Sequence, residues 1–123
     1  MFINRTAKGE IDMEKKEYNK LVRDFFPDLM KEKGKNVEFE ILDGSQYSEK
    51  LMEKFNEEVE KFRNAGTDRL LSEIVDLLEV VYAIADHRGI TESEVEFMRQ
   101  LKKNRSGGFR KKIMLKTIEE KSL

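Results

Sequence analysis

The chain has 123 residues, no cysteine and one histidine, and its 24 basic and 25 acidic side chains leave a formal net charge of −1. This length suits one modest core, so we expect a single domain over residues 13–123 behind a polar N-terminal extension, residues 1–12. The absence of cysteine excludes disulfides, a thiolate nucleophile and a thiolate zinc site, and the lone His87 excludes a multi-histidine metal site. The balanced charge therefore does not identify a partner.

The distribution of apolar residues argues against a membrane protein. No apolar stretch reaches the roughly 18 residues that a membrane span requires. Residues 1–12 also lack the apolar core of a secretory signal. We therefore expect a cytoplasmic protein that does not contact a membrane.

The first predicted elements lie before residue 43. Pro27 suits the first turn of a short helix that ends at Gly34. Val37, Phe39 and Ile41 then alternate with polar residues, which predicts a short extended segment near 37–42. A second extended segment is expected near 113–118.

The next helix begins after Asp43, which can form a capping box with Gln46. Its apolar residues recur every three or four positions, and Gly66 ends it after about residue 65. This pattern predicts an amphipathic helix with one apolar face.

The central helix is predicted to begin with Thr67 or Asp68 as its cap and to end at Gly89. Apolar residues fall on nearly all of its sides, so we expect it to be central and buried. Thr91 and Glu94 can form a capping box for a last helix, which ends at Gly107. The pattern predicts an all-α bundle.

Carboxylates interrupt the apolar central helix at intervals of three residues: Glu73, Asp76 and Glu79. A buried carboxylate is costly unless it is paired or binds a metal. Glu57 and Glu58 lie on the preceding helix, and a short turn would bring the two acidic patches face to face as a two-helix carboxylate hairpin. Oxygen ligands alone favour Mg²⁺, or Mn²⁺, over zinc or copper.

A simpler alternative is that these acids form a solvated face with nearby cations. Glutamate and lysine commonly cover exposed helix surfaces. The candidate partners are Lys50, Lys54, Lys61 and Arg69. This alternative suits Glu57 and Glu58 better than it suits Glu73 and Asp76, which lie in the more apolar helix.

Glu57-Glu58 followed by Glu73-Ile74-Val75-Asp76 resembles the paired-glutamate and E-x-x-D signature of the MazG-like superfamily, which includes dimeric dUTPases and phosphoribosyl-ATP pyrophosphohydrolases. The resemblance extends over about residues 18–118. It includes, in order, residues 18–24 (YNKLVRD), Pro27, residues 41–43 (ILD), residues 78–83 (LEVVYA) and residues 107–109 (GGF).

The resemblance implies a Mg²⁺-dependent nucleotide pyrophosphohydrolase with a MazG-like helical bundle. Such an enzyme cleaves a nucleoside triphosphate or related nucleotide between its α- and β-phosphates, giving a monophosphate and pyrophosphate. The implied catalytic and metal-binding residues are Glu57, Glu58, Glu73 and Asp76. Because the carboxylate hairpin is too small to enclose a buried site alone, we expect a homodimer or homotetramer to complete the core and cleft.

One position departs from the family signature. The third glutamate of the E-E-x-x-E pattern falls on Lys61, which is i+4 from Glu57 and i+3 from Glu58. Its ammonium group should therefore lie between these carboxylates and compete with a divalent cation. This departure supports an alternative function, a catalytically weakened or inactive helical oligomer that binds nucleotides.

Basic residues could supply the countercharge that a triphosphate needs. Lys20 and Arg23 are substrate-binding candidates by resemblance, and Lys102, Lys103 and Arg105 are candidates because they lie in a basic run without acids, residues 99–112. The run can instead complement a helix dipole or remain solvated. Nucleic acid ranks below a nucleotide as its ligand, because Phe109 is the only aromatic residue available for base stacking in the run.

Overall fold

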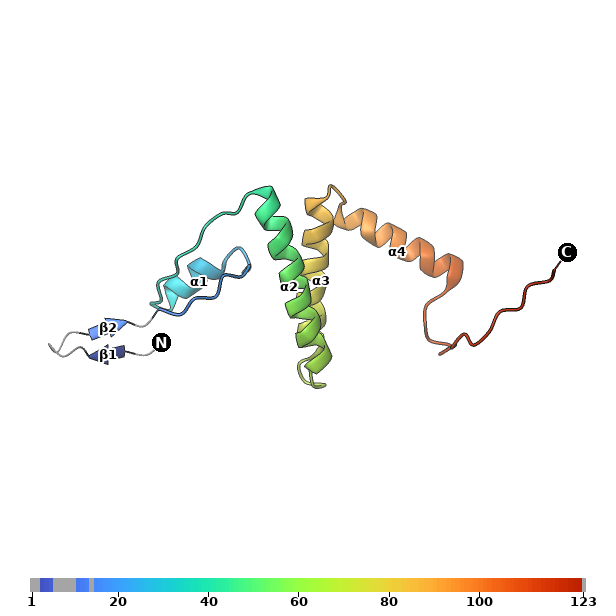
Figure 1. Ribbon diagram of the computed structural model, residues 1–123, viewed down its shortest axis with the longest axis horizontal. Helices are drawn as coiled ribbons and strands as arrows, with labels where there is room; N and C mark the ends of the chain where they lie inside the picture. Colours follow the sequence, from blue (N-terminus) through green and yellow to red (C-terminus); the bar gives the residue numbers. More distant parts are fainter. Residues whose placement is uncertain (1–2, 6–10, 14, 123) are drawn as a thin grey trace. The chain divides into compact units, whose positions relative to one another are not determined.

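The structure is a computed structural model that describes residues 3–5, 11–13 and 15–122 (Figure 1). Within these residues the larger elements are four helices, so the all-α prediction is confirmed. They are α1 (Phe26–Glu32), α2 (Gly44–Asn64), α3 (Leu70–His87) and α4 (Glu92–Ser106).

A short antiparallel strand pair lies in the N-terminal region, where the sequence predicted no regular element. Strand β1 (Ile3–Arg5) pairs with β2 (Ile11–Met13), with Ile3 opposite Met13. The other parts of the predicted polar extension, residues 1–2 and 6–10, lie outside the described residues.

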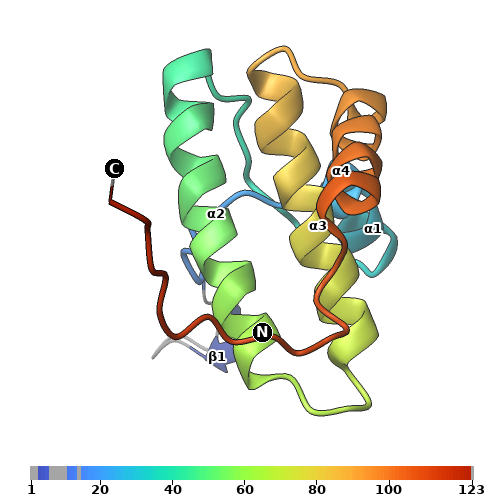
Figure 2. The ribbon, with the colours of Figure 1, turned by 90° about the vertical axis from the view of Figure 1, so that its right-hand side faces the viewer.

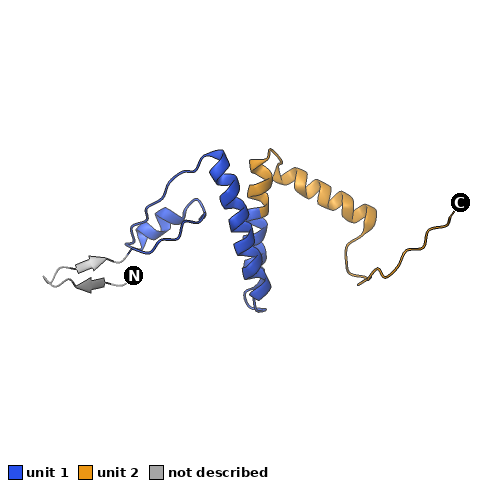
Figure 3. Cartoon of the chain, viewed as in Figure 1, with its two compact units in different colours: residues 1–80 blue, residues 81–123 orange. Residues whose placement is uncertain are grey.

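The chain divides into two compact units, Met1–Val80 and Val81–Leu123 (Figure 3). The first contains the strand pair, α1, α2 and the first part of α3. The second contains the end of α3, α4 and the segment that follows it. A single domain over residues 13–123 stays a prediction.

Both ends of α2 follow the sequence signals. The Asp43 side chain accepts a hydrogen bond from the Gln46 backbone N–H (2.8 Å), and the Gln46 side chain accepts one from the Asp43 N–H (3.2 Å). This predicted capping box satisfies two backbone donors that the first helical turn leaves unpaired. The helix ends at Asn64, two residues before Gly66.

The start predicted for α3 is wrong by a few residues. Neither Thr67 nor Asp68 begins the helix, because residues 66–69 form a turn in which the Arg69 N–H donates to the Gly66 carbonyl (3.0 Å). The helix starts at Leu70. For α4, the Thr91 hydroxyl accepts from the Glu94 N–H (3.1 Å), which is one of the two hydrogen bonds of the predicted capping box.

The ends of α1 and α4 also agree with the sequence. Pro27 lies in the first turn of α1, and Gly34 follows its end with φ +76°. Gly107 follows α4 with φ +82°. Glycine adopts this backbone conformation at little cost, whereas a side chain at Cβ would strain it.

The predicted extended segments contain no strand. No helix or strand occurs in residues 35–43, between α1 and α2, or in residues 107–122, after α4. Alternating apolar residues stabilise a strand only when a partner strand accepts its hydrogen bonds, and neither segment has one among the described residues.

Helix α2 and the first part of α3 lie side by side in the first unit (Figures 1 and 2). Leu51 on α2 and Val80 on α3 are the only buried apolar side chains among the described residues. Many apolar side chains of α3 are exposed in the single chain, including Leu71, Ile74, Val75 and Leu78. The prediction that α3 is buried on nearly every side is therefore wrong for the isolated chain.

Candidate functional site

Each of the two adjacent helices places one carboxylate on its buried face. Glu58 lies seven residues after Leu51 on α2, and Glu73 lies seven residues before Val80 on α3. Seven residues are about two helical turns, so each glutamate shares a face with a buried aliphatic side chain. Glu58 is 3% exposed and Glu73 is 6% exposed. The helix geometry therefore directs both acids toward the space between α2 and α3.

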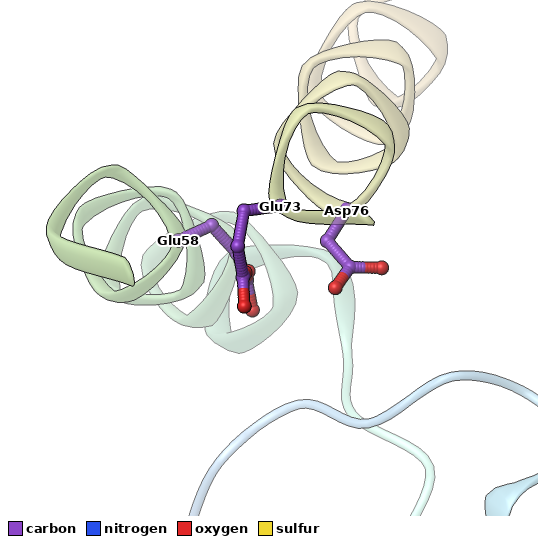
Figure 4. A group of neighbouring side chains, drawn as sticks. All are labelled: Glu58, Glu73 and Asp76. Atoms are coloured by element: carbon purple, nitrogen blue, oxygen red, sulfur yellow. The ribbon is translucent and has the colours of Figure 1, made fainter. Parts of the chain in front are cut away.

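Asp76 joins this pair one turn after Glu73. One carboxylate oxygen from each of Glu58, Glu73 and Asp76 lies within 4.8 Å of the other two. Figure 4 shows the three carboxylates directed toward the same side of the two helices. The predicted face-to-face approach of the two acidic patches is therefore present for these three residues.

Two oxygens of this carboxylate cluster, Glu58, Glu73 and Asp76, have no hydrogen-bond partner. They are Oε2 of Glu58 and Oε2 of Glu73, and both are buried. An unpartnered buried carboxylate oxygen is unfavourable, and neighbouring carboxylates add repulsion. The arrangement thus supplies closely spaced oxygen ligands, with two buried glutamate oxygens left without hydrogen-bond partners, and these features suit a bound cation.

Two lysines on α2 compensate part of this negative charge. Lys54 Nζ lies 3.4 Å from Glu57 Oε1 and 3.2 Å from Glu58 Oε1. Lys61 Nζ lies 3.2 Å from Glu57 Oε1 and 3.4 Å from Glu58 Oε1. The inference that the Lys61 side chain lies between Glu57 and Glu58 is confirmed.

The N-terminal part of the described chain provides two further cations. Lys20 Nζ donates to Glu57 Oε1 (3.3 Å), and Arg23 Nη2 donates to Asp76 Oδ1 (2.7 Å). The sequence singled out Lys20 and Arg23 as substrate-binding candidates but did not predict these carboxylate partners. Both side chains neutralise part of the acidic charge at the site.

Arg69, the residue before α3, approaches Glu73 on that helix, with 3.6 Å between Nη2 and Oε1. Beside this pair lies an open depression of about 520 Å³ whose lining includes Lys61, Arg69, Glu73 and Asp76. The depression gives solvent and small solutes a route to one side of the carboxylates.

The lysines determine the ionisation of Glu57. Burial alone would raise its pKa, but the hydrogen bond from Lys61 and the charges of Lys54 and Lys20 outweigh burial, so the pKa is lowered. For Lys61, burial would lower the pKa, but Glu57 and Glu58 raise it. Near neutral pH, Glu57 is therefore a carboxylate and Lys61 an ammonium ion.

The structure brings together three of the four predicted metal ligands. Glu57 is outside the carboxylate cluster, and its Oε1 pairs with Lys20, Lys54 and Lys61. Two other acids of α2 near this position pair elsewhere, Glu53 with Lys50 and Glu60 with Arg63.

The solvated-face alternative holds only in part. Lys54, Lys61 and Arg69 pair with these acids, whereas Lys50 pairs with Glu53. Glu58 is buried rather than solvated. Glu79, the third acid that interrupts the apolar sequence of α3, is exposed and outside the carboxylate cluster.

The remaining substrate-binding candidates lie in the second unit. Lys102, Lys103 and Arg105 occupy the last turns of α4, and all three are exposed. Cationic side chains there complement the negative end of the helix dipole. Their role toward a nucleotide stays a prediction.

Comparisons of the chain with models of protein families, with curated proteins and with solved structures give no match. Among the residues that the structure describes, none of the helices is both long enough and apolar enough to cross a membrane.

Proposed function

We propose that the protein is a Mg²⁺-dependent nucleotide pyrophosphohydrolase with a MazG-like fold. The observation that carries the proposal is the carboxylate cluster: three carboxylates from two helices have oxygens within 4.8 Å of one another, and two of these carboxylates have a buried oxygen that lacks a partner. Ion pairs that serve only the fold normally leave no buried acceptor without a hydrogen-bond partner. A hard cation suits both features, and Mn²⁺ would suit the same oxygen ligands.

The residues that would hold the cation are Glu58, Glu73 and Asp76, with Glu57 next to them. When bound, the cation would neutralise phosphate oxygens and stabilise the charge that develops as a phosphoanhydride bond breaks. Asp76 is 39% exposed, so water can reach it. Glu57, whose lowered pKa keeps it ionised, is available to orient water or accept its proton.

The substrate is proposed to be a nucleoside triphosphate or related nucleotide, cleaved between its α- and β-phosphates. Lys20 and Arg23 lie at the carboxylates and would bind phosphate oxygens. Lys102, Lys103 and Arg105 are proposed to add countercharge from α4.

We further propose a homodimer or homotetramer that covers the apolar surface of α3. Leu71, Val75 and Leu78 are spaced as i, i+4 and i+7, so they share one face of the helix, and all three are exposed. A second copy of the chain would cover this face and enclose the cleft.

A specific observation favours the alternative of a weakened or inactive nucleotide-binding oligomer. Five cations, Lys20, Arg23, Lys54, Lys61 and Arg69, lie next to only four carboxylates, Glu57, Glu58, Glu73 and Asp76. A divalent cation must compete with this internal charge compensation, which lowers its affinity.

A panel of nucleotides incubated with purified protein and Mg²⁺, scored for pyrophosphate release, tests the proposal. Release that disappears with EDTA and in Glu58→Gln supports hydrolysis at the carboxylate cluster. Nucleotide binding without release at any Mg²⁺ concentration would support the alternative. Absence of both binding and release would contradict the two candidate functions.

A further inference from the structure

Residues 19–23, which we call the strap, connect the N-terminal region to both carboxylate-bearing helices. The Lys50 side chain on α2 donates to the Asn19 carbonyl (3.1 Å), and Lys20 pairs with Glu57 on the same helix. Arg23 pairs with Asp76 on α3. The strap therefore joins both helices through polar contacts at the candidate metal site.

Local backbone structure positions both ends of the strap. Asn19 has φ +48°, a left-handed conformation that asparagine tolerates better than most residues. At the other end, the Arg23 carbonyl accepts a hydrogen bond from the Phe26 N–H (3.0 Å), next to the start of α1. These features direct Lys20 and Arg23 toward the carboxylates, although neither residue belongs to α2 or α3.

The Arg23–Asp76 pair differs from the lysine pairs on α2. Lys54 and Lys61 are on the same helix as Glu57 and Glu58, so the helix holds them close to these acids whatever else binds. Arg23 is on a separate segment, and its side chain is 61% exposed. Exposed ion pairs contribute little net stability, so the Arg23–Asp76 contact can be broken at a small cost in free energy.

From these contacts we infer that Arg23 is an exchangeable internal counterion that gates the metal site. It neutralises Asp76 when no divalent cation is bound. Metal binding at Asp76 displaces the guanidinium, which then binds a phosphate oxygen of the nucleotide. The inference rests on the proposed function for the identity of both ligands, and no covalent step is involved.

The exchange makes the two ligands cooperative. While the Arg23 guanidinium pairs with Asp76, it competes with the metal for this carboxylate. It must leave Asp76 before it can donate all of its hydrogen bonds to phosphate. Phosphate therefore removes a competitor of the metal, and the metal releases a donor for phosphate. By linkage, each ligand must raise the affinity of the other by the same factor.

Calorimetric titration with Mg²⁺, with and without inorganic phosphate, tests this coupling on the full chain. In the wild-type protein we expect phosphate to tighten Mg²⁺ binding by about fivefold or more. Arg23→Gln should bind Mg²⁺ more tightly than wild type without phosphate, and phosphate should have little further effect. The matched control is Arg69→Gln, which removes a cation from Glu73 but leaves the strap intact, so phosphate coupling should persist.

Amide hydrogen exchange in the strap gives a second readout. The loss of a positive charge at Arg23 would not by itself make this exchange respond to Mg²⁺. Mg²⁺ alone should increase exchange in residues 19–23 of the wild type, and added phosphate should reduce it again. In Arg23→Gln, Mg²⁺ should not change exchange in the strap. Circular dichroism on each variant checks that the helices remain folded.

The outcomes separate this inference from the proposed function. If Mg²⁺ binds but phosphate coupling is equal in wild type and Arg23→Gln, the proposed displacement of Arg23 is wrong and the proposed metal site stands. If coupling depends on Arg23 but no nucleotide yields pyrophosphate, the proposed displacement of Arg23 stands and the hydrolase proposal fails. If neither wild type nor Arg23→Gln binds Mg²⁺, both are wrong.

Discussion

Lys61 contacts both acids of the paired-glutamate motif, with Nζ 3.2 Å from Glu57 Oε1 and 3.4 Å from Glu58 Oε1. Lys61→Glu changes the charge at this position by two units. We expect Mg²⁺ to bind about tenfold more tightly. A tenfold change in affinity corresponds to about 1.4 kcal/mol, and a neighbouring charge can supply this free energy. Isothermal titration measures the change, and pyrophosphate release should rise with it.

Arg63→Glu is the matched control for Lys61→Glu. It makes the same charge change on α2, but Arg63 pairs with Glu60 rather than with a residue of the carboxylate cluster. Its effect on Mg²⁺ affinity should be clearly smaller. If Lys61→Glu tightens Mg²⁺ yet weakens a non-hydrolysable nucleotide, Lys61 binds substrate phosphate. Equal effects of the two variants would show that contact with Glu57 and Glu58 is unimportant.

Asp76 is the predicted ligand that solvent reaches most easily within the carboxylate cluster, and it also pairs with Arg23. Mg²⁺ or Mn²⁺ should raise the melting temperature of the wild type, because a ligand that binds only the folded state stabilises it. Asp76→Asn should largely abolish this increase while preserving the helicity. A metal response equal to that of the wild type would exclude Asp76 as an important ligand.

The ion pair between Glu57 and Lys61 predicts a pH-dependent contribution to stability. Burial opposes ionisation of Glu57, but Lys61, Lys54 and Lys20 together lower its pKa. A lowered carboxyl pKa stabilises the fold above the unfolded pKa of about 4.3, and this stabilisation is lost as the pH falls through the lower folded pKa. In metal-free buffer, Lys61→Met should therefore melt at a lower temperature than wild type near neutral pH.

This melting-temperature difference should shrink as the pH falls below about 4.3, the pKa of an unfolded glutamate, and then through the lower folded pKa of Glu57. Because the pKa of Lys61 is raised, the difference should stay constant between about pH 6 and 9. Differential scanning calorimetry of both proteins measures the melting-temperature difference in the acidic range and in the neutral range. A constant difference down to pH 3 would mean that Lys61 stabilises the fold through packing rather than through Glu57.

At the scale of the elements, α2 depends on its N-terminal cap. Asp43→Ala removes one half of the capping box with Gln46 and leaves a backbone donor of the first turn without its side-chain acceptor. We expect a loss of about 1 kcal/mol in the free energy of unfolding, measured by urea denaturation. Glu49→Ala, at an exposed position within the same helix, should change stability by less than half as much.

The two helices that bear the carboxylates differ in how well their sequences predicted them. Both ends of α2 follow from Asp43, Gln46 and Gly66. At α3, two cap candidates, Thr67 and Asp68, precede the apolar run, and the turn closed by Gly66 and Arg69 decides that the helix begins only at Leu70. Side-chain capping preferences alone do not determine where such a turn ends.

At the scale of the whole molecule, the exposed apolar face of α3 predicts self-association. Leu71 is 74% exposed and Val75 is 50% exposed, and Leu78 continues the same face. The double variant Leu71→Glu/Val75→Glu places two like charges on this face, so a dimer that buries it should dissociate. Sedimentation at micromolar concentration measures the assembly state of both proteins.

Asn56→Glu on α2 is the control for the assembly experiment, because it adds a charge at an exposed polar position. It should leave the sedimentation coefficient unchanged. A wild-type protein that sediments as a monomer with native helicity would contradict the shared-cleft proposal. A dimer that resists the double variant would place the interface on another surface.

The sequence by itself determined the helices and the identity of the acids. Capping residues and glycines indicate where α1, α2 and α4 begin or end, because these signals act over a few residues. The i,i+3 spacing of Glu73 and Asp76 and the position of Lys61 between Glu57 and Glu58 likewise follow from helical periodicity. Each of these inferences concerns contacts within one helix.

Only the tertiary structure decided which charges meet. Glu58 of α2 joins Glu73 and Asp76 of α3 because the turn at residues 65–69 sets how these helices face each other. Arg23 reaches Asp76 across 53 positions of sequence, and Lys20 reaches Glu57 across 37. Such contacts depend on the path of the whole chain, whereas periodicity describes one element at a time. The same reason explains why the strap's role as a counterion could not be read from its lysine and arginine alone.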